Sequence, residues 1–237
     1  MDFKKILFYV FIIIVIFSLY KWLFRDSTTV NILDMQSAKK PHTKKLKSGG
    51  SSVQFAYSFW IYVTGWEYRL TEEKIIVERK GADSDEPCPK IALAKNVNDL
   101  EITLATSSNS GSNVEPCKIK NIPLQKWTHI VVTTNIQSMD TYIDGKLVKT
   151  CLLKGPAKIN ADADILVSST SSDNSSKKGF DGNIAKLRYY PRTLNPREVY
   201  ELYKEGPQKG MFGSLFNKYK LKFQYVVDNE VQGQLTI

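Results

Sequence analysis

The stretch that decides the fold lies between Trp127 and Leu152 and reads WTHIVVTTNIQSMDTYIDGKLVKTCL. It contains three segments rich in β-branched and aromatic residues, at 130–134, 141–143 and 147–150, a composition typical of strands. Asp144-Gly145 separates the second segment from the third, and both residue types accept the positive φ of a two-residue hairpin turn. The stretch therefore predicts three consecutive antiparallel strands.

Apolar and polar residues also alternate outside this meander. In FAYSFWIYV, residues 55–63, the alternation places Phe55, Tyr57, Phe59 and Ile61 on one face of a strand. Similar short segments, separated by loops rich in Ser, Asn, Asp and Gly, occur at 74–78, 91–94, 100–105, 119–122, 165–168 and 183–190. Many short strands with turn signals predict an all-β sandwich.

One short helix is predicted after the last of these strands. Asn195 can cap it, Pro196 suits its first position, and Glu198 completes a capping-box spacing. Gly206-Pro207 then ends the helix, with Val199 on its buried face.

These segments resemble the concanavalin A-like lectin/glucanase superfamily, in its laminin-G-like and pentraxin-like branch. The resemblance is carried by PLQKWTHIVVTT, DTYIDGKLV, GFDGNIAKLRYYPRTLNPREVYELYKEG and FAYSFWIYV. It implies a two-sheet antiparallel sandwich of the jelly-roll type over residues 53–206. The residues expected in its core are Trp60, Trp127, Ile130, Val132, Tyr142 and Phe180.

A narrower resemblance concerns CPKIAL at 88–93, NIPLQKW at 121–127 and the two tyrosines after KLR. These short runs are similar to the version of the fold found in membrane-associated proteins of large DNA viruses. The narrower resemblance implies a structural protein of a virion.

A single transmembrane helix is predicted before the sandwich, in residues 1–25. ILFYVFIIIVIFSLYKWLF, residues 6–24, carries Lys21 as its one charge; at about 1.5 Å per residue it would extend roughly 28 Å, close to the thickness of a bilayer's hydrocarbon. A cleaved signal peptide is the alternative, but KWLFRD stands where a small-residue cleavage site would be. The residues expected to anchor the chain are Ile6, Phe11, Ile14, Phe17, Trp22 and Phe24.

The positive charge lies mainly outside the predicted sandwich. The chain has a net charge of +9, but residues 53–206 contain 20 basic and 19 acidic side chains. No basic cluster marks a nucleic-acid surface there, so no nucleic-acid partner is expected. Residues 26–52 are predicted to be a basic juxtamembrane linker whose lysines could bind anionic headgroups at about 1 kcal/mol each. A solvated spacer, or a first edge strand at 30–33, is the alternative.

Flanking charge predicts the orientation of the chain. Lys4 and Lys5 precede the apolar span, whereas Lys21, Arg25, Lys39 and Lys40 follow it. Because basic residues are retained on the cytosolic side, the C-terminal domain is expected there.

The acidic clusters do not favour catalysis. A glycosidase needs two carboxylates facing each other across the scissile bond. Of Glu72-Glu73, Asp83-Ser84-Asp85-Glu86 and Asp162-Ala163-Asp164, only the last could place two on one strand face. His129 accompanies no Ser or Cys nucleophile motif and is expected to be a packed histidine. The protein is therefore expected not to be an enzyme.

No cofactor is expected, although calcium remains the alternative because loop carboxylates and amides could bind it. The candidate ligands are Asp140, Asp144, Asp173, Asn174 and Asp181, of which Asp144 and Asp181 also suit turns.

Cys88, Cys117 and Cys151 are too scattered for a zinc site. If a disulfide forms, Cys117 and Cys151 are the favoured pair because both flank the meander. Three reduced cysteines are expected if the domain is cytosolic.

Residues 207–237 are predicted to be a C-terminal extension. Apolar and polar residues alternate from Tyr219 to Val227, and a turn at Asp228-Asn229 leads back through 231–237. This hairpin is expected to serve in assembly with another chain, the alternative being that 219–227 adds to an edge of its own sandwich.

The residues and the resemblances together predict a non-catalytic, membrane-anchored structural or interaction module. It would be a minor capsid or virion protein of a large DNA virus, linking the inner membrane to the capsid shell. Its partners would be lipid and other capsid or membrane proteins, with its C-terminal domain on the cytosolic, capsid side of a single span. The alternative is a membrane-anchored lectin-like protein whose glycan surface contains Trp66, Tyr68, Asp173 and Asn174.

Overall fold

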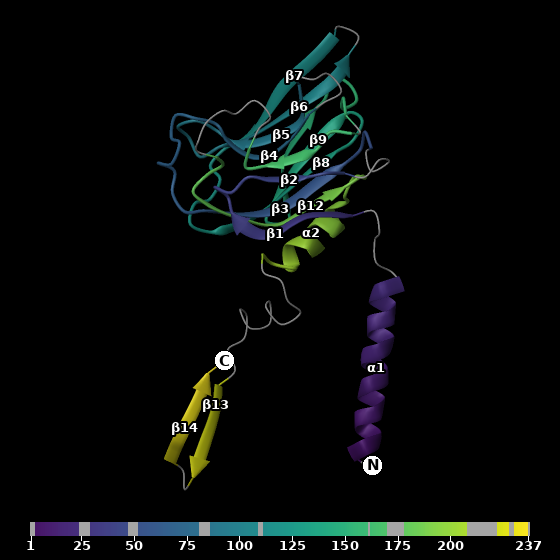
Figure 1. Ribbon diagram of the computed structural model, residues 1–237, viewed down its shortest axis with the longest axis vertical. Helices are drawn as coiled ribbons and strands as arrows, with labels where there is room; N and C mark the ends of the chain where they lie inside the picture. Colours follow the sequence, from purple (N-terminus) through teal and green to yellow (C-terminus); the bar gives the residue numbers. More distant parts are fainter. Residues whose placement is uncertain are drawn as a thin grey trace.

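Two antiparallel sheets of six strands each pack face to face in the computed structural model of the chain (Figure 1). The structure describes residues 3–23, 29–46, 52–80, 86–108, 111–160, 162–169, 178–207, 222–227 and 230–236. The strand order in the first sheet is β1 (Val30–Ser37), β12 (Gly182–Tyr190), β3 (Ala56–Val63), β8 (Trp127–Thr134), β9 (Ser138–Ile143) and β10 (Lys146–Leu152). In the second sheet it is β2 (His42–Lys44), β11 (Ile165–Val167), β4 (Lys74–Lys80), β5 (Pro87–Leu93), β6 (Leu100–Ser108) and β7 (Gly111–Ile119). The predicted all-β two-sheet sandwich is confirmed.

The predicted meander is formed by β8, β9 and β10. Ile143 pairs with Ile130 on one side and with Lys146 across the turn. Asp144 and Gly145 occupy that turn with φ values of 49° and 77°, the positive values for which these residue types are suited. A side chain at Gly145 would also come within 3.1 Å of Tyr200.

The core between the sheets is built from one face of each strand. It contains Phe55, Tyr57, Phe59 and Ile61, which the alternation places on one face. Ile130, Val132 and Phe180 are buried in the same cluster.

Three residues expected in that core lie elsewhere. Along β8, alternation gives Trp127 the face opposite to Ile130, and its half-buried ring packs against Tyr62 with centroids 5.6 Å apart. Trp60 and Tyr142 are buried, but Trp60 stacks on Tyr203 of the helix and Tyr142 belongs to a separate small cluster. Trp60 and Tyr142 are thus buried as predicted, although beneath α2 and not between the sheets. The prediction that Trp127 is buried between the sheets was wrong, because strand parity turns its side chain to the outer face.

Helix α2 (Pro196–Lys204) packs on the outer face of the first sheet, where Val199 is buried. The Asn195 side chain accepts a hydrogen bond from the Glu198 N–H at 2.9 Å, and the Glu198 carboxylate accepts one from the Asn195 N–H at 2.9 Å. The predicted capping box therefore forms.

The sandwich begins before residue 53, so the predicted linker over 26–52 is wrong in part. Strand β1 pairs with β12, and β2 pairs with β11. Ile32 and Leu33 are buried in the core. The edge strand at 30–33, the alternative left open by the sequence, is the arrangement found, because an apolar Ile-Leu pair lies in the polar segment.

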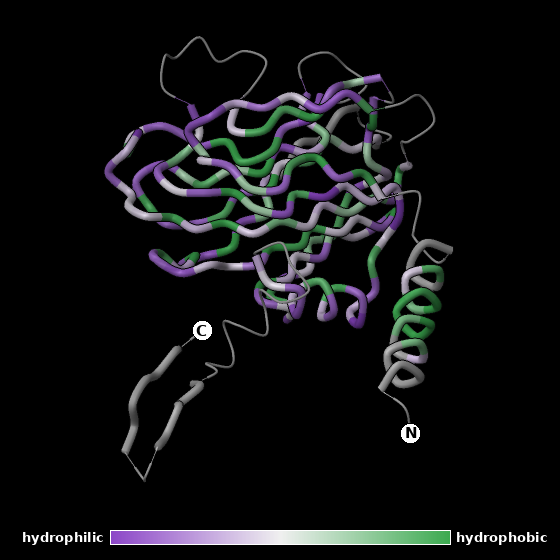
Figure 2. Tube along the Cα trace, turned by 60° about the horizontal axis from the view of Figure 1, so that its bottom comes forward, coloured by the Kyte–Doolittle hydropathy of each residue, from purple (hydrophilic) through white to green (hydrophobic). Residues whose placement is uncertain are grey.

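Helix α1 (Phe3–Leu23) precedes the sandwich, and Figure 2 shows that the middle of this helix is apolar. Of the predicted anchor residues, Phe11, Ile14 and Phe17 are exposed. The side chains of Ile6 and Trp22, and the whole of Phe24, lie outside the described part of the chain. Among the described residues, no helix combines the length and the hydropathy that crossing a membrane requires. The membrane span stays a prediction.

Strands β13 (Lys222–Val227) and β14 (Glu230–Thr236) form a two-stranded sheet of their own (Figure 1). Within the described strands, neither is hydrogen-bonded to one of the six-stranded sheets. The hairpin thus forms as predicted, while its predicted turn at 228–229 lies outside the described residues.

A disulfide joins Cys117 of β7 to Cys151 of β10, with their Cα atoms 6.2 Å apart. These strands are the last of the second and first sheets respectively, so the bridge ties two sheet edges together. It is the pair favoured by the sequence, and Cys88 remains a buried thiol.

Candidate functional site

Three segments that are distant in sequence meet at one end of the sandwich. The Thr64 N–H donates to the Asp181 carbonyl at 2.9 Å, and the Ala38 N–H donates to the Gly182 carbonyl at 2.9 Å. The loop after β3, the turn after β1 and the segment before β12 are thereby held together. The charged and aromatic side chains at this end, Lys39, Trp66, Tyr68, Arg69 and Lys74, are called the loop-end cluster below.

Gly179 permits the close approach of two of these segments. Its φ is +55°, and a Cβ at this position would lie 1.8 Å from the Ala38 carbonyl oxygen. Any other residue would force the segments apart, so the glycine in the GFDG motif positions the cluster.

Tyr68 and Lys39 form the partly exposed side of the cluster. The Tyr68 hydroxyl donates to the Lys178 carbonyl at 3.1 Å, and the Lys39 ammonium lies 4.6 Å from the centroid of the Tyr68 ring. Lys39 also pairs with the Asp181 carboxylate. The hydroxyl of Tyr68 is therefore held by a hydrogen bond, and its ring lies next to the Lys39 ammonium.

Trp66 and Lys74 form the inner side of the cluster. Lys74 is fully buried at the start of β4, and its ammonium lies 4.3 Å from the centroid of the half-buried Trp66 ring. Within the described structure, neither the Lys74 Nζ nor the Trp66 Nε1 has a hydrogen-bond partner. Burial lowers the pKa of Lys74, and the nearby positive charge of Arg69 lowers it further, only partly opposed by Glu72.

The neighbouring carboxylates are already paired with other cations. Glu72 accepts from the Arg69 guanidinium at 2.7 Å, and Glu73 accepts from the Lys90 ammonium at 2.9 Å. The Glu72-Glu73 cluster thus balances the charges of Arg69 and Lys90. Of the second acidic cluster, Asp83 and Asp85 lie outside the described residues. In the third, Asp162 and Asp164 precede β11, so they do not share a face of that strand.

The calcium candidates are spread over the fold and engaged elsewhere. Asp140 accepts from the Thr150 hydroxyl at 2.6 Å, Asp144 accepts from the His129 backbone at 2.9 Å, and Asp181 pairs with Lys39. Asp173 and Asn174 lie outside the described residues. In the part of the chain that the structure describes, no three His, Cys, Asp or Glu side chains are grouped as for a metal ion.

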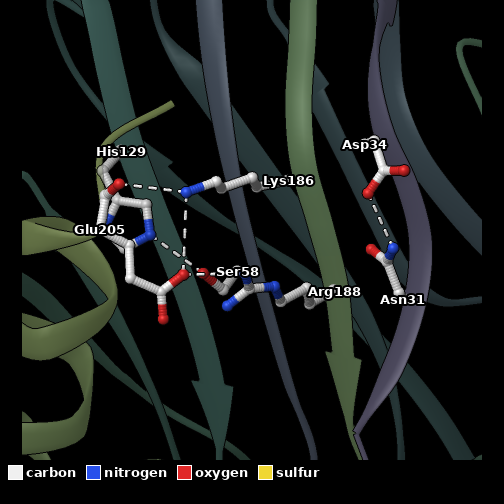
Figure 3. Close-up of polar contacts among 7 residues, drawn as sticks. All are labelled: Asn31, Asp34, Ser58, His129, Lys186, Arg188 and Glu205. Atoms are coloured by element: carbon white, nitrogen blue, oxygen red, sulfur yellow. Dashed lines mark hydrogen bonds and ion pairs between the residues drawn. The ribbon is translucent and has the colours of Figure 1, made fainter. Parts of the chain in front are cut away.

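A second polar cluster lies between the first sheet and α2 (Figure 3). It consists of Ser58, His129, Lys186, Arg188 and Glu205 and is called the α2 network below. Arg188 pairs with the Glu205 carboxylate at 2.8 Å, and Lys186 donates to the Glu205 carbonyl at 3.1 Å. These contacts hold the C-terminal end of the helix against the sheet.

A bulge in β12 places both cations on the outer face. The register with β3 shifts between Ala185 and Arg188, and Lys186 has a φ of 46°. Because the bulge adds a residue, Ile184 and Leu187 both face the core while Lys186 and Arg188 both face the helix.

The Ser58–His129 pair in this network has the composition of a catalytic dyad, but not its accessibility. The Ser58 hydroxyl and His129 Nε2 are 2.9 Å apart, and His129 is 1% exposed with its ring 4.9 Å from Trp60. Burial lowers the pKa of His129 to about 4, opposed in part by Asp144. The carboxylate of Asp144 binds the His129 backbone and not its ring. The pair therefore packs α2 onto the sheet, as expected for a packed histidine.

The structure brings two of the four predicted glycan-surface residues into one cluster and places three further side chains beside them. Trp66 and Tyr68 both belong to the loop-end cluster, as the sequence proposed. Lys39, Arg69 and Lys74 were missed, because Lys39 was assigned to a linker and Lys74 to an ordinary strand start. The signal that could have found Lys74 is its position directly before the apolar residues of KIIV, 74–77, which predict a buried strand.

Known proteins share this architecture. A family model described as the concanavalin A-like lectin/glucanases superfamily matches residues 38–200, more than half of the chain. No curated protein matches the sequence. Similar solved structures include the botulinum neurotoxin serotype D ligand-binding domain in complex with N-acetylneuraminic acid, at 14% identity over 75% of this chain and 46% of that chain with a TM-score of 0.55. Another is the receptor-binding domain of the serotype C/D mosaic, at 15% identity over 75% and 46% with a TM-score of 0.55.

The binding domain of serotype G matches less well, at 16% identity over 74% of this chain and 45% of that chain with a TM-score of 0.50. The chain thus spans less than half the length of each of these neurotoxin domains. At such low identity the likeness shows a common fold.

Proposed function

The chain belongs to the concanavalin A-like lectin/glucanase superfamily, and on this premise we propose that it is a non-catalytic, carbohydrate-binding module. The observation that carries the proposal is the loop-end cluster, in which the half-buried rings of Trp66 and Tyr68 lie beside cationic side chains. Aromatic faces suit the apolar faces of sugar rings, and a few fixed polar groups then select the ligand.

The comparisons support the proposal at the level of the fold. The serotype D domain has been solved with N-acetylneuraminic acid, so a sandwich of this fold occurs in a protein that binds a sugar. The buried Ser58–His129 pair and the paired Glu72 and Glu73 carboxylates support a binding role over hydrolysis.

A glycan array probed with the full-length chain in detergent tests the proposal. A fragment beginning at Val53 would lack β1 and β2 and is unsuitable. We expect selective binding, reduced at least tenfold by the double variant Trp66→Ala/Tyr68→Ala. The control Tyr200→Ala removes an exposed ring on α2 and should bind as the parent does. Background signal for every glycan would overturn the proposal, and hydrolysis of a bound oligosaccharide would overturn its non-catalytic part.

A second candidate function, structural attachment, is favoured by two other observations. First, α1 exposes apolar side chains that suit lipid or another apolar surface, among them Phe11, Ile14 and Phe17. Second, the hairpin β13–β14 is a separate sheet with two free edges in the described structure. In this candidate the chain is a minor capsid protein of a large DNA virus, attached to the inner membrane by α1 and to a capsid protein by the hairpin.

Two experiments test the second candidate. Carbonate extraction should leave the full-length chain in the membrane pellet, and its recovery in the supernatant would remove the anchor. Truncation after Pro207 should leave a folded protein that no longer enters the assembly. A truncated chain that unfolds or aggregates would mean that the hairpin belongs to the sandwich.

A further inference from the structure

The two inner groups of the loop-end cluster are both hydrogen-bond donors that lack an acceptor. Lys74 is 0% exposed, and neither its ammonium nor the Trp66 indole N–H is hydrogen-bonded within the described residues. A buried ammonium without an acceptor is costly, and the partial negative charge of the Trp66 face compensates for only part of the lost hydration. Within the described structure, the two donors therefore lack a negatively charged hydrogen-bond acceptor.

The protein side chains nearest to Lys74 do not supply that acceptor. The Arg69 guanidinium repels it, and the adjacent carboxylates of Glu72 and Glu73 are bonded to Arg69 and Lys90 at 2.7 and 2.9 Å. Among the described residues, no carboxylate is hydrogen-bonded to this donor pair, so a ligand is the candidate source of a negatively charged acceptor.

The chemistry of the donors restricts the ligand. A lysine ammonium and an indole N–H can only donate, so the matching group must accept hydrogen bonds from both and carry negative charge. A carboxylate meets both requirements and can accept from the two donors with separate oxygens.

We propose that the loop-end cluster binds an acidic sugar, whose carboxylate accepts hydrogen bonds from Lys74 Nζ and Trp66 Nε1 while its ring packs on Tyr68. The inference rests on the proposed function, since it names the ligand class of that same site.

Access to Lys74 requires a movement of Trp66. The indole ring covers the ammonium at 4.3 Å, and it belongs to the loop 64–73, in which Thr64, Glu67, Leu70, Thr71 and Glu72 are exposed. A rotation of this half-buried ring would uncover the donor pair, so ligand binding should change the fluorescence of Trp66.

The test titrates the full-length chain in detergent with two matched pairs of ligands. The pairs are the methyl glycoside of N-acetylneuraminic acid with its neutral methyl ester, and glucuronic acid with its neutral methyl ester. Calorimetry and tryptophan fluorescence measure binding. We expect one acid to bind at least tenfold more tightly than its ester. Equal affinity within both pairs would overturn the inference, and so would inorganic phosphate binding as tightly as the acids.

Three variants identify the donors. Lys74→Met keeps the length of the buried side chain without its charge and should abolish the preference for the acid. Trp66→Phe keeps an aromatic ring without the N–H and should reduce the preference several-fold. Lys118→Met, the matched control on β7, removes a lysine that is paired with Glu101 at 2.8 Å, outside the loop-end cluster, and should leave the preference unchanged. An undiminished preference in both Lys74→Met and Trp66→Phe would overturn the inference.

Failure of the inference differs from failure of the proposed function. If the chain binds neutral glycans on the array and shows no preference for acids, the proposed carbohydrate-binding function stands and the proposed acidic ligand is wrong. Absence of binding to every sugar, neutral or acidic, removes both.

Discussion

The loop-end cluster and the α2 network are both polar clusters set in an apolar sandwich, yet they differ in how their charges are balanced. In the α2 network, Lys186 and Arg188 both contact Glu205, and the Ser58 hydroxyl is bonded to His129. In the loop-end cluster, the most deeply buried cation, Lys74, has no hydrogen-bond acceptor in the described structure. Ion pairs and hydrogen bonds such as those of the α2 network fix a helix on a sheet. A buried charge without a partner lowers the stability of the fold, and we attribute its presence at the loop end to ligand binding.

The largest expected effect is the loss of the aromatic stack that supports the α2 network. Trp60→Ala should lower the free energy of unfolding by about 3–5 kcal/mol, because Trp60 is 5% exposed and its ring packs against the rings of both His129 and Tyr203. Trp127→Ala, at a half-buried position, should cost clearly less. Chemical denaturation of both variants measures the difference, and equal losses would contradict the assignment of Trp127 to the outer face.

The next effect is a loss of stability in acid through His129. Its pKa falls from 6.5 to about 4 in the folded state, so the unfolded chain binds the proton more tightly. Stability is then fully present above pH 6.5 and is lost as the pH falls toward 4, by up to about 3 kcal/mol. Chemical denaturation between these pH values should show that the free energy of unfolding depends less on pH in His129→Gln than in the parent. Identical profiles would mean that the histidine is hydrated in the folded state.

A smaller effect of opposite sign is expected at the loop end. Lys74→Met should raise the free energy of unfolding by about 1 kcal/mol, because it replaces an unpaired buried ammonium with an apolar side chain of similar length. Thermal unfolding of this variant beside Lys118→Met, which removes a lysine paired with Glu101 outside the cluster, measures the effect. A large destabilisation by Lys74→Met would make Lys74 a structural residue and remove the contrast between the two clusters.

The smallest effect is expected at the helix end of the α2 network. Glu205 is 42% exposed, so solvent screens its ion pair with Arg188. Glu205→Gln should cost about 0.5 kcal/mol, and high salt should reduce the difference between variant and parent. A cost that is independent of salt would point to the hydrogen bonds of the side chain and not to its charge.

Local patterns predicted most of the fold. Alternation located β3 and β12, the Asp144-Gly145 turn located the β9–β10 hairpin, and Asn195 with Glu198 located the start of α2. These predictions succeed because turn geometry, capping and strand parity depend on residues close in sequence. The predictions for Val30–Ser37 and His42–Lys44 were less successful, because β1 and β2 are edge strands whose partners, β12 and β11, lie more than a hundred residues away.

The sequence by itself determined the class of fold, the capped helix and two aromatic members of the candidate site, Trp66 and Tyr68. Only the tertiary structure decided that Lys74 lies beneath Trp66, that Glu72 and Glu73 pair with other cations, and that Ser58 meets His129 under α2. Composition and periodicity report which face of a strand a residue occupies. Whether a buried charge has a partner depends on side chains brought together from loops and strands far apart in the chain, and that information exists only after the sheets have packed.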